Sequence, residues 1–503
     1  QIIDTFGEKY LYGGGLSVRT SLDTKAQFQA DTALKEGLLV YDKRYGYRGV
    51  IKNDQTNNWL INLKDVALPY NFQFAKVISV NENSAYIETS LNENGEIKLS
   101  NLTWAREHIK GGYVGPKIIS VEDVLKKHDI IYVSIKNNGD YVLEQIPDIN
   151  GGIVVMDPHS GRVVALSGGF DFKLSNFNRA SQAKRQPGSA FKPFVYISAL
   201  ENGLQPNSLI LDAPFVVDQG ERLGKWKPEN YGKKFYGPSP LRKGIENSRN
   251  LMTIRIAQYL GMDKISEIAN RVEIMSDMPE VLSMALGAGE TTLIDLTSAY
   301  SSFVNGGKKI YPILIDRIQD RRGKNIYLAD FGVCLNCSDP FIEDSPVPVI
   351  KDGNMQIFDP VNSYQMVSIL KGAVDRGTGR RTKITGFEIG GKTGTTNKNT
   401  DAWFIGFTSD LIIGVYAGFD NPRTLGKRET GSSVAVPIFK NFITNYYKEK
   451  KALPFKIPNG VELIQVNIDT GEVSYETNND KTIYEAFRKS DKLILDNKTL
   501  IGS

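Results

Sequence analysis

Apolar residues recur first at helical spacing and then in alternation with polar residues, and this change divides the first third of the chain. Residues 26–39 carry the helical pattern behind a polar start at 20–23, so we expect a linker over 1–40 that enters a helix. Residues 41–148 carry short alternating runs separated by Asn, Gly and Asp, which predict a small all-β barrel. The predicted strands of this barrel are 49–51, 75–80, 85–89, 130–135 and 141–145.

After residue 149 the pattern changes again, to strands and long helices. A hairpin, then helices, then three strands predict an α+β fold over 149–447, in which helices sandwich an antiparallel sheet. Thr292 with Asp295 resembles a helix capping box, and residues 448–503 are expected to be a polar, partly ordered C-terminal tail. The predicted strands are 152–156, 162–166, 390–395, 402–408 and 411–419, and the predicted helices are 191–202, 245–260, 293–304, 361–374 and 435–447.

Composition narrows the class of protein. The 503 residues are 41% hydrophobic and 23% charged, which is ordinary for a globular chain and too long for one core. The net charge of +4 comes from basic residues scattered among acidic ones, so we expect no nucleic-acid partner. No apolar run approaches the ~18 residues that cross a bilayer, and no secretory signal is present. Because the chain begins with Gln1, we interpret it as a fragment of a longer protein.

Two cysteines, Cys334 and Cys337, form a single C-x-x-C pair. Zinc would need two further ligands nearby, and the three histidines lie far away in the sequence, so no metal site and no cofactor are expected. We favour a local loop disulfide formed in an oxidising compartment over a pair of idle thiols.

The first of three short motifs joins Ser189 to Lys192. Pro187 and Gly188 precede Ser189 and suit the start of a helix, which places Lys192 on the same helical face as Ser189. A serine hydroxyl needs an adjacent base, and a lysine serves as one only where burial or a nearby positive charge lowers its pKa. The motif therefore indicates a serine nucleophile with Lys192 as its base, although alone it equally suits an ordinary helix start.

The other two motifs follow in the same order along the chain. Ser248 and Asn250 belong to Ser-Arg-Asn, where Ser248 is placed to relay a proton between Lys192 and Lys392 and Asn250 to hold a peptide backbone. Residues 390–395 are a predicted strand in which Lys392, Thr393 and Thr395 offer charge and hydroxyls to a carboxylate, and Gly394 leaves room for an extended substrate. The backbone N–H groups of Ser189 and Thr395 are the expected oxyanion hole.

Each later motif alone also has an ordinary interpretation, as a helix N-cap or a Gly-rich loop. Their joint occurrence in this order resembles the transpeptidase part of a class A penicillin-binding protein. The resemblance extends to 168–169, 179–180, 185–193, 226–231, 285–288, 376–379, 390–396 and 401–406. It covers roughly 150–445, with a weaker similarity of 41–148 to the OB-like domain of the Gram-negative 1a group. Arg249 departs from the Asp that class A β-lactamases favour at that position.

The resemblance implies a D,D-transpeptidase that cross-links peptidoglycan stem peptides through an acyl-enzyme at Ser189 and is inhibited by β-lactam antibiotics. It implies that Trp226 contacts the substrate or β-lactam. A glycosyltransferase domain and a membrane anchor would precede Gln1, on the periplasmic side of the inner membrane, and the OB-like domain would bind protein partners. Two alternatives stay open: a serine β-lactamase, for which Glu280 is the candidate base, and a cell-wall-binding or β-lactam-sensing protein.

Overall fold

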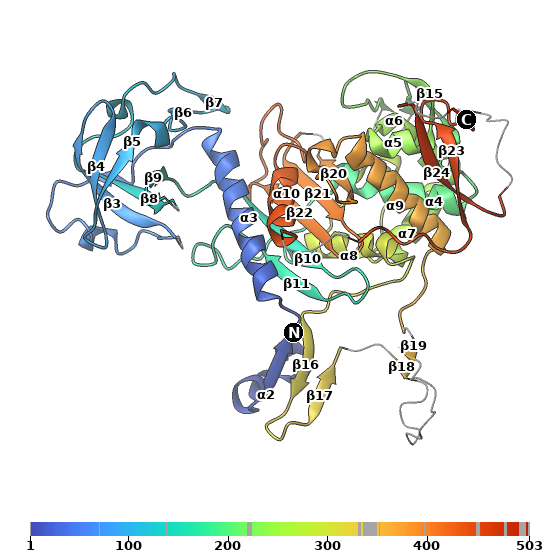
Figure 1. Ribbon diagram of the computed structural model, residues 1–503, viewed down its shortest axis with the longest axis horizontal. Coiled ribbons are helices and arrows are strands. Elements are labelled where there is room, and N and C mark those ends of the chain that lie inside the picture. The colour runs from blue at the N-terminus through green and yellow to red at the C-terminus, as the bar shows by residue number, and fades with distance from the viewer. Residues whose placement is uncertain are drawn as a thin grey trace.

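The chain folds into a larger and a smaller lobe, and the long helix α3 (Thr24–Lys43) lies between them, packed on the larger one (Figure 1). The computed structural model describes residues 2–69, 71–136, 138–218, 224–329, 333–334, 350–351, 353–396, 398–448, 453–476, 480–491 and 499–500. The predicted disulfide involves Cys337, which lies outside these residues. Within them, no helix is both long enough and apolar enough to cross a bilayer.

The larger lobe is built on a five-stranded sheet in which every neighbouring pair is antiparallel. The strand order is β11 (Val163–Ser167), β10 (Asn150–Met156), β22 (Ile412–Gly418), β21 (Asp401–Phe407) and β20 (Gly390–Thr395). Alternate residues of β10 point to opposite faces: Val154 and Met156 enter one hydrophobic cluster, whereas Ile153 and Val155 enter the other. Both faces are therefore buried, which confirms the predicted α+β fold with a sandwiched sheet.

Helices cover the two faces of this sheet. On one face lie α3 (Thr24–Lys43) and α10 (Ala435–Tyr446), whose apolar side chains join the Ile153 cluster. The other face is covered by α4 (Lys192–Glu201), α8 (Leu293–Val304) and α9 (Pro360–Asp375), with α6 (Asn250–Leu260) and α7 (Met262–Arg271) packed behind them. At the start of α8 the Thr292 side chain accepts a hydrogen bond from the Asp295 N–H (3.2 Å), as the sequence predicted.

The predicted helix over 245–260 is wrong, because the chain breaks there into two helices. α5 (Leu241–Glu246) ends before Ser248, whose φ of +56° is left-handed, and α6 begins at Asn250. A residue with left-handed backbone cannot continue a right-handed helix. Apolar spacing alone does not reveal such a break, because the helices on both sides bury apolar faces.

Both ends of the chain pack against the larger lobe, whereas the sequence predicted a linker at one end and a partly ordered tail at the other. α3 packs into the core of the larger lobe, and β1 (Ser17–Thr20) pairs with β16 (Ile315–Gln319). At the other end β23 (Val461–Asn467) and β24 (Thr482–Arg488) form a hairpin against α9, with Ala486 and Glu485 fully buried. The prediction of a tail missed this hairpin, because its partners lie more than a hundred residues earlier in the chain.

The smaller lobe is an all-β domain inserted between α3 and β10. Its strands are β2 (Lys52–Asn53), β3 (Gln73–Val80), β4 (Ser84–Thr89), β5 (Asn94–Lys98), β8 (Asp129–Ile135) and β9 (Tyr141–Glu144). The ends of the insertion lie together, since Gln145 Nε2 donates to the Gly46 carbonyl at 2.9 Å.

Short elements complete the described chain. They are α1 (Ile2–Phe6), α2 (Glu8–Gly13), β6 (His108–Ile109), β7 (Tyr113–Val114), β12 (Leu209–Asp212), β13 (Val217–Asp218), β14 (Lys225–Trp226), β15 (Gly237–Pro240), β17 (Asn325–Leu328), β18 (Val333–Cys334), β19 (Ile350–Lys351) and six 3-10 turns, of which η4 (Gly188–Phe191), η5 (Leu282–Leu286) and η6 (Arg380–Thr382) matter below.

Candidate active site

Ser189 lies in η4, the 3-10 turn that leads into α4, and is half-buried. The turn packs tightly on β20. Gly188 has a φ of +53°, and a Cβ there would come within 2.6 Å of the Thr395 carbonyl oxygen, so this position requires glycine. From the other side the Tyr300 hydroxyl donates to the Ala190 carbonyl at 2.5 Å. The turn is thereby held with Ser189 beside the end of β20.

Two fully buried lysines converge on Ser248. Lys192 Nζ donates to the Ser248 carbonyl and to Asn250 Oδ1, both at 2.7 Å, and lies 3.4 Å from Ser248 Oγ. Lys392 Nζ donates to Ser248 Oγ at 2.9 Å and to the Thr393 carbonyl at 3.0 Å. Ser248 Oγ therefore lies between the two amines.

Burial changes the chemistry of both amines. Removal from water lowers the pKa of Lys192 well below its usual value, and the nearby charge of Lys392 lowers it further. Burial lowers the pKa of Lys392 to about 7. Neither lysine forms an ion pair with an acidic side chain of the described residues. A lysine amine that is neutral has a lone pair that can accept a proton, so the lowered pKa suits Lys192 to act as a base.

The contacts of Arg249 and Asn250 fix the turn that carries Ser248. Arg249 pairs with Asp212 at 3.6 Å, its Nη1 donates to Ser239 Oγ at 2.7 Å, and its guanidinium lies 4.1 Å from the centre of the Tyr236 ring. The Asn250 amide is oriented by its Nδ2, which donates to the Glu229 carbonyl at 2.7 Å. The middle residue of this motif thus has a structural role, which accounts for the departure at Arg249.

β20 is the edge strand of the sheet and forms the other wall of the site. A Cβ on Gly394 would come within 2.3 Å of the Pro187 carbonyl oxygen, so glycine allows η4 to approach. Thr393 Oγ1 is 2.9 Å from Thr378 Oγ1, and Thr395 Oγ1 accepts from the Gly431 N–H at 3.0 Å. Sequence patterns did not indicate a role in the site for Thr378 or Gly431. Thr378 belongs to the segment 376–379, which resembles penicillin-binding proteins but was given no role in the predicted site.

The structure thus joins Lys192, Ser248, Asn250 and Lys392 by hydrogen bonds and packs the turn of Ser189 against β20. In the described chain the hydrogen bonds of Lys192 Nζ go to the 248–250 turn and not to Ser189. Trp226 lies apart on β14, half-buried and paired with Val217. Three residues later, the Glu229 carbonyl accepts a hydrogen bond from Asn250 Nδ2, which links this segment to the site.

Comparisons with known proteins agree with this architecture. Residues 151–444 match the family described as penicillin binding protein transpeptidase domain, and residues 47–149 match the penicillin-binding protein OB-like domain. Penicillin-binding protein 1A of Rickettsia conorii is 42% identical over 501 residues, covering 99% of this chain and 62% of that protein. Its namesake in Pseudomonas aeruginosa is 33% identical over 527 residues, covering 98% and 64%.

The crystal structure of penicillin-binding protein 1A from Haemophilus influenzae superposes with a TM-score of 0.82 at 29% identity, covering 97% of this chain and 74% of that one. The chain spans about three fifths of the length of the curated relatives that it matches. The transpeptidase match alone extends over more than half of the chain and contains all three motifs. The chain therefore belongs to the penicillin-binding protein transpeptidase family and carries the OB-like domain of that family as an insertion.

Proposed function

We propose that this chain is a serine D,D-transpeptidase that cross-links peptidoglycan stem peptides. The observation that carries the proposal is the pair of buried lysines around Ser248, next to the turn of Ser189. Two buried amines that form no ion pair with any described acid are costly to keep protonated, so the site is suited to proton transfer rather than to structural ion pairing.

In the acylation step Ser189 Oγ attacks the carbonyl carbon of the bond between two terminal D-Ala residues, and Lys192 accepts the hydroxyl proton. The proton then passes through Ser248 to the leaving amine, with Lys392 orienting the Ser248 hydroxyl. The C–N bond breaks, the terminal D-Ala departs, and the acyl group stays on Ser189. The backbone N–H groups of Ser189 and Thr395 stabilise the oxyanion.

In the second step an amine of another stem peptide attacks the ester and receives the acyl group, which forms the cross-link. Water in place of the amine would give a D,D-carboxypeptidase side reaction. A β-lactam enters by the same first step, but its leaving nitrogen stays tethered in the opened ring, and the acyl-enzyme persists.

Substrate recognition is assigned to the edge strand and its neighbours. An extended peptide adds to β20 by backbone hydrogen bonds, and Lys392, Thr393 and Thr395 bind the terminal carboxylate. Asn250 and Trp226 are assigned to the substrate as well, Asn250 through the amide that already faces Lys192.

Fluorescent penicillin tests the proposal. The wild-type chain should become covalently labelled, and mass spectrometry should place one acyl adduct on the peptide that contains Ser189. Ser189→Ala should remove the label, whereas Ser208→Ala, which changes a buried serine at the start of β12, should leave it. A wild-type chain without label, or equal label on Ser189→Ala, would contradict the proposal.

No observation favours the β-lactamase alternative. Glu280 is exposed in the loop before η5 and hydrogen-bonds none of the described site residues. Turnover of a chromogenic cephalosporin faster than roughly once a second would nevertheless restore that alternative.

We further propose the division into a segment 1–40, an OB-like domain over 41–148, a transpeptidase domain over 149–447 and a C-terminal segment over 448–503. The whole protein would be anchored in the inner membrane and face the periplasm, and the OB-like domain would bind protein partners.

A deletion tests the role of the OB-like domain. Since the ends of the insertion are adjacent, residues 50–143 can be replaced by a short Gly-Ser linker. If the shortened chain still bound every protein partner of the full chain, the proposal that the OB-like domain binds partners would be wrong.

A further inference from the structure

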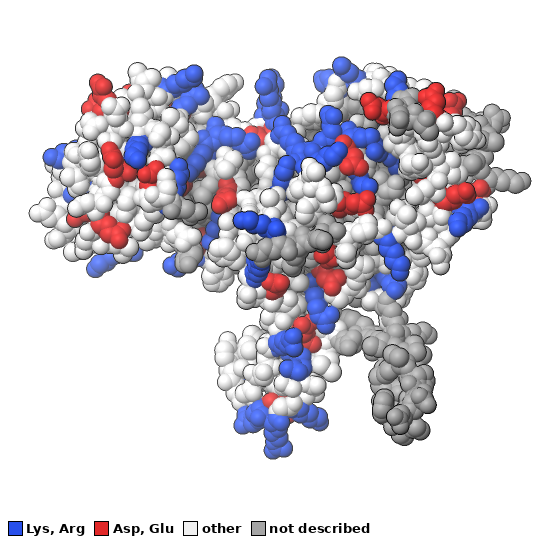
Figure 2. All heavy atoms as spheres, viewed as in Figure 1, with Lys and Arg blue, Asp and Glu red and all other residues white. Residues whose placement is uncertain are grey.

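Lys and Arg side chains gather along the upper edge of the molecule, over the end of α3 and the adjoining end of the central sheet (Figure 2). The segment between β22 and α10 contributes to this edge. It carries three exposed cations, Arg423, Lys427 and Arg428. Its two acids are Asp420, which is exposed and pairs with Arg179 at 2.5 Å, and Glu429, which is buried. Both acids of the segment are therefore bound by other side chains of the protein, whereas its cations are exposed to solvent.

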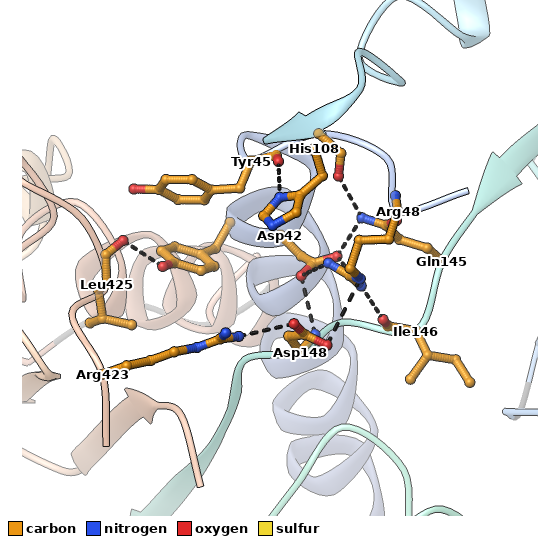
Figure 3. Close-up of polar contacts among 11 residues, drawn as sticks. Asp42, Tyr45, Arg48, His108, Gln145, Ile146, Asp148, Arg423 and Leu425 are labelled. Carbon is orange, nitrogen blue, oxygen red and sulfur yellow. Dashed lines mark hydrogen bonds and ion pairs between the residues drawn. The ribbon is translucent and has the colours of Figure 1, made fainter. Parts of the chain in front are cut away.

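Contacts at both ends fix the path of this segment. The Tyr41 hydroxyl donates to the Leu425 carbonyl at 2.6 Å, and Arg423 pairs with Asp148 at 2.9 Å (Figure 3). Further along, the Gly431 N–H donates to Thr395 Oγ1 at 3.0 Å. The segment thus runs from the junction with the OB-like domain to the end of β20.

Four exposed cations meet along this path, and we call them the basic rim: Arg44, Lys398, Lys427 and Arg428. Arg44 is placed by Glu429, 3.4 Å away, and Lys398 by its neighbour Asn399, whose carbonyl accepts from the Leu425 N–H at 2.7 Å. Lys398 follows Thr395 by three residues, at most about 11 Å along the chain. In the described chain Lys398, Lys427 and Arg428 form no ion pair with an acid.

We propose that the basic rim binds carboxylate groups of a peptidoglycan strand and so extends the substrate site beyond the terminal carboxylate. The inference rests on the proposed function. Cross-linking requires a second strand near Ser189, and a strand with many stem peptides carries many carboxylates. The basic rim is a row of exposed cations that begins at the substrate strand and continues toward the OB-like domain, and three of the four have no acidic partner among the described residues. Such a row matches an extended anion in sign and shape.

The test is equilibrium binding of soluble, fluorophore-labelled peptidoglycan strands to the 503-residue chain with Ser189→Ala, which prevents acylation. The rim variant is Lys427→Gln with Arg428→Gln. Its matched control is Arg322→Gln with Lys324→Gln in the exposed turn between β16 and β17, which removes the same two charge types far from β20 (Figure 1). Thermal unfolding of both variants checks that each is folded.

At low salt the rim variant should bind strands about three- to tenfold more weakly than the parent, and the control should match the parent. The difference should shrink as salt screens the charges, and amidation of the strand carboxylates should remove it. Equal binding by the rim variant, equal loss by the control, or equally tight binding of duplex DNA would overturn the proposal. Penicillin labelling of the rim variant that retains Ser189 distinguishes the basic-rim proposal from the proposed function. If this variant is labelled but strand binding is unchanged, only the basic-rim proposal is wrong. If the wild-type chain is not labelled, the proposed function is wrong.

Discussion

Two groups of buried charges flank the same helix, α5, and differ in how they are balanced. In one, Arg242 bonds Glu246 and Glu485, and Arg376 bonds Glu246 at 2.5 Å, so that two cations face two anions. In the other, Lys192 and Lys392 share Ser248 with no acidic partner among the described residues. Arg242, Glu246, Glu485, Lys192 and Lys392 are almost completely buried, whereas the Arg376 side chain is 32% exposed.

The balance of charge decides what each group does. Burial acts to lower the pKa of Arg242, but Glu485 and Glu246 outweigh it and the pKa is raised, so this group stays charged and holds α5, α9 and β24 together. At Lys192 burial lowers the pKa and the charge of Lys392 lowers it further, and the opposing charge of Asp212, which forms no ion pair with Lys192, does not outweigh them. Burial thus leaves Arg242 charged in a structural ion pair, because acids are in contact with it, and favours a neutral Lys192 that can act as a base.

The largest effect is expected from Lys192→Met, which keeps the chain length of the side chain but removes the amine. The rate of acylation by fluorescent penicillin should fall about 10²–10⁴-fold, because Ser189 loses its base. Lys243→Met is the matched control, since it removes a lysine at the surface end of the same region, where Asp469 is its partner. Unchanged acylation of Lys192→Met would assign the base elsewhere.

Breaking the balanced group should cost stability. Glu485→Leu leaves Arg242 and Arg376 with Glu246 alone, and the free energy of unfolding in urea should fall by about 3–5 kcal/mol. Adding Arg242→Met should recover most of this loss, because Glu246 and Arg376 remain a balanced pair. As a control, Asp316→Asn removes a more exposed ion pair with Arg162 and should cost about 1 kcal/mol or less. A double variant no more stable than the single one would contradict this account.

The pH dependence of acylation should be bell-shaped. Below the lowered pKa of Lys192 its amine is protonated and cannot act as a base, so the rate rises with pH through that value. Above a pH of about 7 the free enzyme loses the positive charge on Lys392 and its attraction for the carboxylate, so the rate falls again. Each limb should change by about tenfold per pH unit far from the optimum.

Lys392→Arg separates the two limbs. A guanidinium remains charged over the whole range, so the alkaline limb should disappear while the acid limb stays. Persistence of both limbs in this variant would show that another group controls the fall at high pH.

The smallest effect is expected from Thr378→Val. It removes the hydrogen bond to Thr393 Oγ1 and should weaken carboxylate recognition by about fivefold, the usual contribution of one hydrogen bond. Thr378→Ser keeps a hydroxyl and should behave like the wild type. If the two variants acylate equally fast over a range of penicillin concentrations, Thr378 has no part in recognition.

Local sequence patterns predicted much of the fold and the set of candidate site residues. Apolar periodicity predicted α8 at the bounds that the structure shows, because the helix buries a regular face and has a clear signal at its start. The bounds of β20 also match the prediction, although residues 390–395 contain no apolar side chain. The candidate nucleophile, lysines and edge strand were predicted from three motifs, since their order and residue types are themselves informative.

The tertiary structure alone decided how those pieces work together. The left-handed backbone at Ser248, the packing of Gly188 on Thr395, the Arg242–Glu485 pair and the segment from Leu425 to Gly431 all depend on contacts between parts of the chain distant in sequence. Residue types determine which groups can ionise, whereas the distance between charges and their removal from water determine whether they do, and these quantities exist only once the chain has folded.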